Sequence, residues 1–205
     1  MEIRLAGVTK IFDPDIVALE DIYLNIDKGE FVYLVGATGS GKTTLLRLIT
    51  REIVPTRGQI VVAKRNLRSM RNSILPYYRR ELGVVFQDYR LLQHLSVLEN
   101  VSFILETTGA HPRTVRDVAS RVLDDVGLWR LRTHYPQQLS GGEQQRLAIA
   151  RAMVNSPSVF IADEPTGNLD LHTSEDIMQL LLSINAAGTT VVVATHDQYL
   201  VDAYR

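Results

Sequence analysis

Four short apolar runs do most to restrict the fold of this chain. Runs rich in Val, Ile and Phe, with no alternating polar positions, are typical of strands that a parallel sheet buries on both faces. They are Phe31–Val35, Val84–Phe86, Val159–Ala162 and Thr190–Ala194. Between the runs, apolar residues recur at helical spacing, for example at Ile177, Leu180, Leu181 and Ile184. Because strands and helices alternate, the sequence predicts an α/β fold with a parallel core sheet.

The parts of the chain outside these runs predict two additions to the core. Apolar and polar positions alternate near the N-terminus, as at Ile3, Leu5 and Val8, which favours antiparallel strands with one solvated face. The segment between the second and third runs is mostly helical in pattern, so we expect a helical subdomain inserted into the core. The predicted divisions are 1–87 and 156–205 for the β-rich core and 88–155 for the insertion, within one domain that spans residues 1–205.

Composition and charge exclude several classes of protein. The chain has 205 residues, of which 45% are apolar, so it can bury a core. The net charge of −1 gives no overall attraction to nucleic acid, and the absence of cysteine excludes disulfides and thiolate metal sites. No apolar run approaches the roughly 20 residues that cross a bilayer, and the first residues lack a secretory signal. We therefore expect a soluble chain whose membrane role comes through a partner.

A glycine-rich string follows the first apolar run and fits the P-loop pattern GxxxxGK[ST]. Its glycines let successive backbone N–H groups turn toward a polyphosphate, and the helix that follows adds the positive end of its dipole. Lys42 is expected to bridge the β- and γ-phosphates of ATP, and the Thr43 hydroxyl to bind Mg²⁺. The sequence thus predicts a P-loop NTPase with a RecA-like core. The predicted phosphate-binding residues are Gly36, Ala37, Thr38, Gly39, Ser40, Gly41, Lys42, Thr43 and Thr44.

Two adjacent carboxylates, Asp163 and Glu164, follow the third apolar run. They end a predicted strand beside the place where a P-loop would lie. Asp163 is expected to hold Mg²⁺ through water, and Glu164 to orient or deprotonate the attacking water. Adjacent acids in a loop are often only solvated, but their position after a buried strand in a P-loop protein favours a catalytic role.

The string Leu139–Arg146, which reads LSGGEQQR, distinguishes among the classes of P-loop protein. Ser140 and Glu143 have the spacing of a helix capping box, and a capped helix start that carries Gly141 and Gly142 is itself an anion site. The string also resembles the LSGGQ signature of the ABC ATPase family, with Glu143 in place of Gln. The resemblance implies an ATP-hydrolysing enzyme whose signature contacts the γ-phosphate of ATP on the opposite subunit. It therefore implies a homodimer that encloses two ATP molecules.

Further positions match other elements of that family. Phe12 lies where the family places an aromatic ring against adenine, although a lone Phe is more often part of a core. Gln87 matches the glutamine that senses Mg²⁺ and the attacking water, and His196 matches the histidine that contacts the γ-phosphate. Gly167–Asp170 matches the loop that crosses the dimer interface. The residues expected to act in catalysis are then Glu164, His196 and Gln87. The residues expected to hold the metal ion are Thr43, Gln87 and Asp163.

The segment Arg79–Leu92 resembles the same region of ATPases that act in bacterial cell division. That resemblance implies an integral membrane partner at the cytoplasmic face of the inner membrane, and an output that activates peptidoglycan hydrolases. Tyr89, Leu91 and Leu92 would line a groove for a short helix of the partner, or would only pack the helical subdomain. Lipoprotein-release and macrolide-efflux ATPases share the signature and the acidic strings, so a transporter ATPase is the alternative.

Features of related proteins that this sequence lacks also shape what we expect of it. Family members usually continue past the histidine through further strands and a helix, whereas this chain stops at Arg205, so we expect a truncated form. A soluble ABC ATPase that acts on DNA or ribosomes is disfavoured, because the sequence has neither a long coiled-coil insertion nor a second ABC module. A kinase or GTPase would leave the signature string unexplained.

Overall fold

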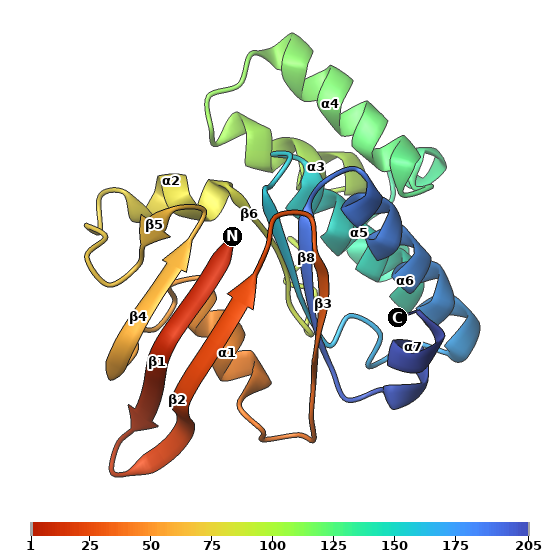
Figure 1. Cartoon of the computed structure of the whole chain (residues 1–205). Helices are drawn as coiled ribbons and strands as arrows, with labels where there is room; N and C mark the ends of the chain where they lie inside the picture. Colours follow the sequence, from red (N-terminus) through yellow and green to blue (C-terminus); the bar gives the residue numbers. More distant parts are fainter. Residues whose placement is uncertain (1, 205) are drawn as a thin grey trace.

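The chain folds into two four-stranded sheets with helices packed around them, as Figure 1 shows. The structure is a computed structural model, and it describes residues 2–204. One sheet is antiparallel with the strand order β2-β1-β4-β5, and it lies on the left in Figure 1. Its strands are β1 (Ile3–Phe12), β2 (Ile16–Ile26), β4 (Arg57–Val62) and β5 (Arg65–Asn66). The alternating positions Ile3, Leu5 and Val8 are all buried, as their pattern predicted.

The second sheet is parallel, with the strand order β3-β8-β7-β6, which confirms the predicted core. Its strands are β3 (Phe31–Val35), β6 (Leu82–Val85), β7 (Val159–Asp163) and β8 (Thr190–Thr195). The two central strands, β7 and β8, are buried along their whole length. In contrast, β3 forms an edge and its residues are half-buried or exposed, with Val35 46% exposed. The prediction of burial on both faces is therefore wrong for β3, because an apolar run does not reveal which strand lies at the edge.

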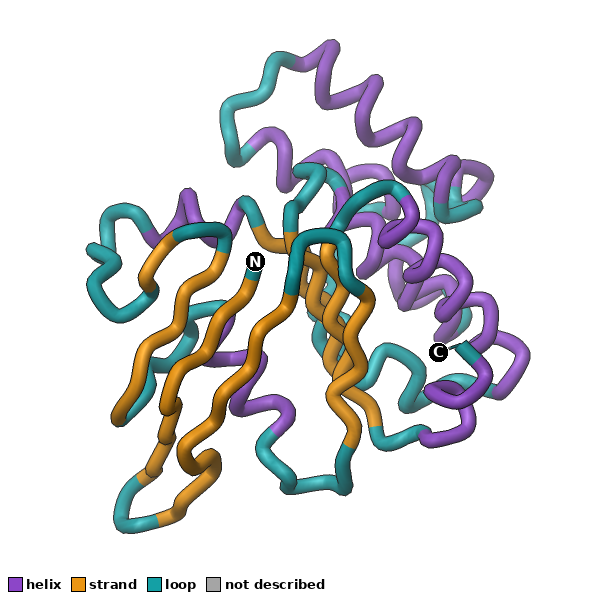
Figure 2. Tube along the Cα trace, in the orientation of Figure 1, coloured by secondary structure: helices purple, strands orange, loops and turns teal. Residues whose placement is uncertain are grey.

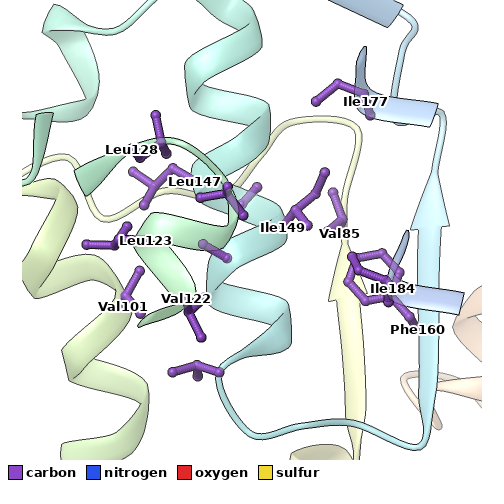
Figure 3. Packing of buried hydrophobic residues seen from close by; sticks show 14 of the residues in the cluster. Val85, Val101, Val122, Leu123, Leu128, Leu147, Ile149, Phe160, Ile177 and Ile184 are labelled. Carbon is purple, nitrogen blue, oxygen red and sulfur yellow. The ribbon is translucent and has the colours of Figure 1, made fainter. Parts of the chain in front are cut away.

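Successive residues of the central strands supply two separate hydrophobic cores. Ile161 and Val192 belong to the core shared with the antiparallel sheet and helix α1 (Lys42–Ile49). Phe160 and Val191 belong to the core on the opposite face of the sheet. Figure 3 shows residues of this second core, which come from strands and from the helices that cover that face. Each large side chain that is fully buried contributes about 1.5–3 kcal/mol to stability.

Most of the helices gather on one side of the core sheet, as Figure 2 shows. Between β6 and β7 the described chain contains only helices and loops, in agreement with the expected helical insertion, whose bounds at 88 and 155 stay a prediction. A short helix before β6, α2 (Leu75–Arg80), was not predicted. None of the described helices is long and apolar enough to span a bilayer. The remaining helices are α3 (Val97–Glu106), α4 (Pro112–Asp125), α5 (Gly141–Met153), α6 (Leu171–Ala186) and α7 (Gln198–Ala203), with 3₁₀ turns η1 (Trp129–Leu131) and η2 (Pro136–Gln138).

Candidate nucleotide-binding site

A tight glycine-rich turn joins β3 to α1. Gly39 and Gly41 have φ angles of 83° and 91°, in the left-handed region that favours glycine. A Cβ atom at Gly41 would lie 2.6 Å from the carbonyl oxygen of Ala18, so only glycine lets the turn close against β2. No side chain caps the start of α1. The first N–H groups of this helix are therefore free to bind an anion.

The ammonium group of Lys42 lies over this turn. Its Nζ donates hydrogen bonds to the carbonyl oxygens of Gly36 and Ala37, at 2.6 and 3.2 Å. It also lies 3.5 Å from Oε1 of Glu164, which reaches the turn from the end of β7. Both charged side chains are largely shielded, with 10% and 12% exposed. A positive charge is thus fixed beside the free helix start, where a polyphosphate would need it.

Asp163, the last residue of β7, has a carboxylate that the protein does not fully satisfy. It is only 9% exposed, and its Oδ1 atom is buried without a hydrogen-bond partner. Burial raises the pKa of Asp163, while a hydrogen bond from Thr43 acts in the opposite direction. An unpaired carboxylate oxygen beside a hydroxyl suits a hard divalent cation such as Mg²⁺, which prefers oxygen ligands. The residues present therefore fit a magnesium ion at this point.

Glu164 and His196 meet at the ends of the two central strands, β7 and β8. Oε2 of Glu164 and Nδ1 of His196 are 2.9 Å apart. Glu164 has a φ of 49°, and its backbone N–H donates to the carbonyl oxygen of Ala194 at 2.9 Å. A left-handed conformation is strained for a residue other than glycine, and it persists only where the surroundings hold it. The sheet therefore fixes this carboxylate in one place beside the imidazole.

Lys42, Glu164 and His196 open onto one hollow of about 310 Å³, which residues 38–44 and Gln87 also line. Asp163 lines a neighbouring cavity of about 510 Å³ instead, and Thr43 and Gln87 belong to the walls of both. Ile16 and Val17 also line the hollow, although they are 63% and 53% exposed, and the sequence analysis missed them. Their position follows from the pairing of strands, which no local pattern reveals. Apolar side chains beside a phosphate-binding turn can cover the flat apolar face of a nucleotide base.

Phe12 is not among the residues that line this hollow. It ends β1 and is half-buried, with Nζ of Lys10 4.8 Å from the centre of its ring. Its partner across the hairpin is Ile16, which does line the hollow. The structure therefore brings Phe12 close to the hollow without placing it in the wall, and its contact with adenine stays a prediction.

The predicted signature segment lies apart from this hollow, and none of its residues lines the wall. The capping box is present, since Oγ of Ser140 accepts from the N–H of Glu143 at 3.4 Å and Oε2 of Glu143 accepts from the N–H of Ser140 at 2.8 Å. The backbone N–H of Ser140 and its hydroxyl, which also donates to Oε2 at 2.8 Å, lower the pKa of Glu143. Gly142 packs so closely that a Cβ atom there would lie 2.4 Å from Cγ2 of Thr173. Ser140 and Gly141 are exposed, so the start of α5 is open to another molecule.

Comparisons with known proteins agree with this geometry. The family model of the ABC transporter matches residues 19–167, more than half of the chain. The chain belongs to the ABC transporter family. This ABC ATPase domain is 50% identical over 206 residues to the cell division ATP-binding protein FtsE of Mycobacterium tuberculosis, a match that covers 100% of this chain and 90% of that protein.

Two further matches extend the comparison. The FtsE protein of Bacillus subtilis is 47% identical to this ABC ATPase domain, over 99% of this chain and 89% of that protein. The ATP-binding cassette MJ0796, solved as a dimer in a post-hydrolysis state with ADP and Pi, superimposes with a TM-score of 0.86. It is 41% identical, and the match covers 95% of this chain and 88% of that one.

The substitution Asp163→Asn is expected to stabilise this ABC ATPase domain when no nucleotide is present. Because burial raises the pKa of the carboxylate above its unfolded value, the folded chain binds this proton more tightly than the unfolded chain does. The contribution of Asp163 to stability therefore falls as pH rises through its titration range, and an uncharged amide removes that penalty. At pH 7 we expect a melting temperature about 2–4 °C higher, measured by circular dichroism without nucleotide.

The gain for Asp163→Asn should shrink at acid pH, as the pH falls through the range in which the native carboxyl group becomes protonated. Asp15→Asn, which changes an exposed carboxylate, is the matched control and should leave the melting temperature unchanged at neutral and at acid pH. A lower melting temperature for Asp163→Asn at pH 7 would contradict the inference that the buried charge is unfavourable.

Proposed function

We propose that two copies of this ABC ATPase enclose two ATP molecules and, by hydrolysing them, drive an integral membrane partner in bacterial cell division. The single observation that carries the enzymatic part is the convergence of Lys42, Glu164 and His196 on one hollow. The cell-division part is supported by the names of the relatives, which are 47–50% identical over nearly the whole of this chain.

The residues of the hollow divide the chemical work between them. Lys42 and the free N–H groups at the start of α1 bind the phosphates, and Glu164 accepts the proton of the attacking water. The imidazole of His196, 2.9 Å from that carboxylate, holds it in position and reaches the γ-phosphate. Thr43 and Asp163 would hold Mg²⁺, with Gln87 beside them. When bound, the ion neutralises phosphate charge.

The signature segment completes the site of the other copy. Ser140 and Gly141 are exposed at the start of α5, outside the hollow of their own chain. In a symmetric dimer the same helix start would meet the γ-phosphate held by the P-loop of the partner copy. Ser140, Gly141, Gly142 and Glu143 are the residues assigned to this contact.

A second groove offers a docking place for the membrane partner, which we take to resemble FtsX. It measures about 580 Å³, and we call it the arginine groove after the side chains of Arg79, Arg80, Arg90 and Arg151 that line it. Tyr89 belongs to its wall, as the docking hypothesis expects, and so does the neighbouring Arg90. Through such a partner the chain would be held at the cytoplasmic face of the inner membrane.

Leu91 corrects one detail of the docking hypothesis. It is only 7% exposed and belongs to the hydrophobic core beneath the helices, so for this residue the alternative interpretation of packing holds. Leu92 is half-buried, and its backbone N–H donates to Oδ1 of Asn100 at 3.0 Å. Neither leucine lines the arginine groove.

Co-purification from membranes tests the proposed partner. The chain, tagged and expressed in its native host, is isolated in mild detergent, and the proteins that accompany it are identified by mass spectrometry. We expect an FtsX-like membrane protein and ATPase activity that rises when the two are combined. A lipoprotein-release or efflux permease in its place would favour the alternative of a transporter ATPase.

Lys42→Ala is expected to weaken ATP binding about 10- to 100-fold. The substitution removes a charge-assisted contact to the phosphates, and such contacts contribute about 1.5–3 kcal/mol each. The measurement is titration with a fluorescent ATP analogue. Lys64→Ala removes the same charge from the exposed turn between β4 and β5 and serves as the control. Equal affinity of the Lys42 variant and the unaltered chain would remove Lys42 from the site.

A further inference from the structure

Helices α5 and α6 lie side by side in Figure 1, and their first turns are in contact. Gly142, the second residue of α5, is buried against the side chain of Thr173 in α6. A Cβ atom at Gly142 would lie 2.4 Å from Cγ2 of Thr173, a distance that real Cβ contacts do not show. The backbone at Gly142 is helical and suits any residue, so glycine is required here by the methyl group of Thr173.

The preceding glycine, Gly141, lies against the segment that leads into α6. A Cβ atom there would lie 3.3 Å from Cδ2 of Leu169, which is half-buried. Leu169 belongs to Gly167–Asp170, the segment that the family resemblance places at the dimer interface. Both glycines of the signature segment are therefore supported by the same short stretch of chain, residues 169–173.

Asp170, the N-cap residue of α6, holds Thr173 in place. Oγ1 of Thr173 donates to Oδ2 of Asp170 at 2.6 Å, and the backbone N–H of Thr173 donates to Oδ1 at 3.0 Å. These bonds lower the pKa of Asp170. Because the hydroxyl and the methyl group of threonine are both attached to Cβ, the bond that fixes the hydroxyl also fixes the methyl group against Gly142.

A tight turn connects Asp170 with Glu164, the carboxylate expected to activate water. The N–H of Gly167 donates to the carbonyl oxygen of Glu164 at 3.2 Å, and the N–H of Leu169 donates to that of Thr166 at 3.1 Å. Thr166 is buried, so the turn is packed against the rest of the domain. Close-packed parts of a protein transmit a displacement instead of absorbing it. The start of α5 and the catalytic end of β7 should therefore move together.

We propose that Thr173 is a positioning residue of the ATPase reaction. Its methyl group sets the place of the signature segment, and its hydroxyl ties that segment to Asp170 and so to the turn after Glu164. This inference rests on the proposed function, in which Ser140–Glu143 complete the site of the other copy, and it adds the residue that aligns them. In a symmetric dimer, each Thr173 links the catalytic carboxylate of one site to the signature segment that serves the other site.

Transfer of one methyl group between the two helices tests the proposal. Gly142→Ala adds a methyl group that collides with Cγ2 of Thr173, so the start of α5 must shift. We expect phosphate release from ATP to slow about 100-fold, as for a displacement of roughly 1 Å in an active site. Adding Thr173→Ser removes Cγ2 and keeps the hydroxyl, and the remaining Cβ lies at an ordinary contact distance of 3.8 Å. The double variant conserves the packed volume and should turn over at least about tenfold faster than Gly142→Ala.

The matched control removes the same methyl group from another buried threonine. Thr190→Ser makes this change at the start of β8 and should leave the defect of Gly142→Ala as it is. The melting temperature and the affinity for a fluorescent ATP analogue are measured for every variant. Because the P-loop is unaltered, Gly142→Ala should bind the analogue as the unaltered chain does, and only its turnover should fall.

Thr173→Val tests the hydroxyl group separately. Valine keeps a methyl group toward Gly142 but cannot donate to Asp170, so the bond of 2.6 Å to a charged acceptor is lost. We expect turnover to fall about tenfold, with the affinity for the analogue unchanged. This variant adds no atom at the contact, so it tests the proposal even where Gly142→Ala does not fold. Turnover of Thr173→Val at the unaltered rate would contradict the role of the hydroxyl.

The remaining outcomes separate this inference from the proposed function. If Gly142→Ala turns over at the unaltered rate, or if the double variant stays as slow as Gly142→Ala, the inference is wrong and the proposed function stands. The inference is also wrong if Thr173→Ser restores only the melting temperature, since the contact would then serve packing alone. If the unaltered chain itself releases no phosphate from ATP, the proposed function fails.

Discussion

Glu164→Gln is expected to bind ATP normally and to hydrolyse it about a thousandfold more slowly, since a positioned general base contributes about 10²–10⁴ in rate. The amide keeps the size of the side chain and can still bond to the imidazole of His196, which lies 2.9 Å from the native carboxylate. It cannot accept a proton from water. The phosphate-binding turn and Lys42 are unchanged, so the complex with ATP should persist. Two copies that cannot complete hydrolysis should then remain together around ATP.

Two measurements check this expectation. Phosphate release gives the rate of turnover, and size-exclusion chromatography with ATP and Mg²⁺ shows whether a dimer accumulates. Glu20→Gln makes the same chemical change at an exposed position of β2 and should hydrolyse ATP as the unaltered chain does. A Glu164→Gln protein that turns over at the unaltered rate would show that another group removes the proton.

The sequence predicted that Lys42, Glu164 and His196 lie together, because each part depends on a short local pattern. The runs that became β7 and β8 are uniformly apolar, and the residues that follow a parallel strand lie at the same edge as those that follow its neighbour. That rule places Glu164 beside His196 although 32 positions separate them. The turn before Lys42 was predictable because only glycine adopts φ angles of 83° and 91° without strain.

The features that the sequence did not predict depend on contacts between distant segments. Helix α2 is only six residues long and carries a proline in its first turn, so it leaves almost no periodic pattern. Its stability comes from Tyr78, which is fully buried against other elements. Ile16 and Val17 look like ordinary exposed strand residues until β2 is placed against the P-loop. Leu91 and Tyr89 are close in sequence, yet one enters the core and the other lines a groove.

The exposure of Ser140, outside the hollow of its own chain, leads to a complementation experiment with two inactive variants. Ser140→Arg places a bulky side chain at the start of α5 and should disable the site of the partner copy. Glu164→Gln disables the site of its own copy. In a mixed dimer, one site combines the P-loop of the Glu164→Gln copy with the α5 start of the Ser140→Arg copy, so it carries both defects. The second site combines the unaltered parts of the two copies and carries none.

Each variant alone should therefore show almost no turnover, while an equal mixture should regain about a quarter of the unaltered activity. This value follows because half of randomly paired symmetric dimers contain one copy of each variant, and one of their two sites is intact. The copies are mixed before ATP is added, since Glu164→Gln dimers should not exchange once ATP is bound. If Ser140 acted on the nucleotide of its own chain, every site in the mixture would keep one defect. Activity that does not recover on mixing would thus exclude a site shared between two copies.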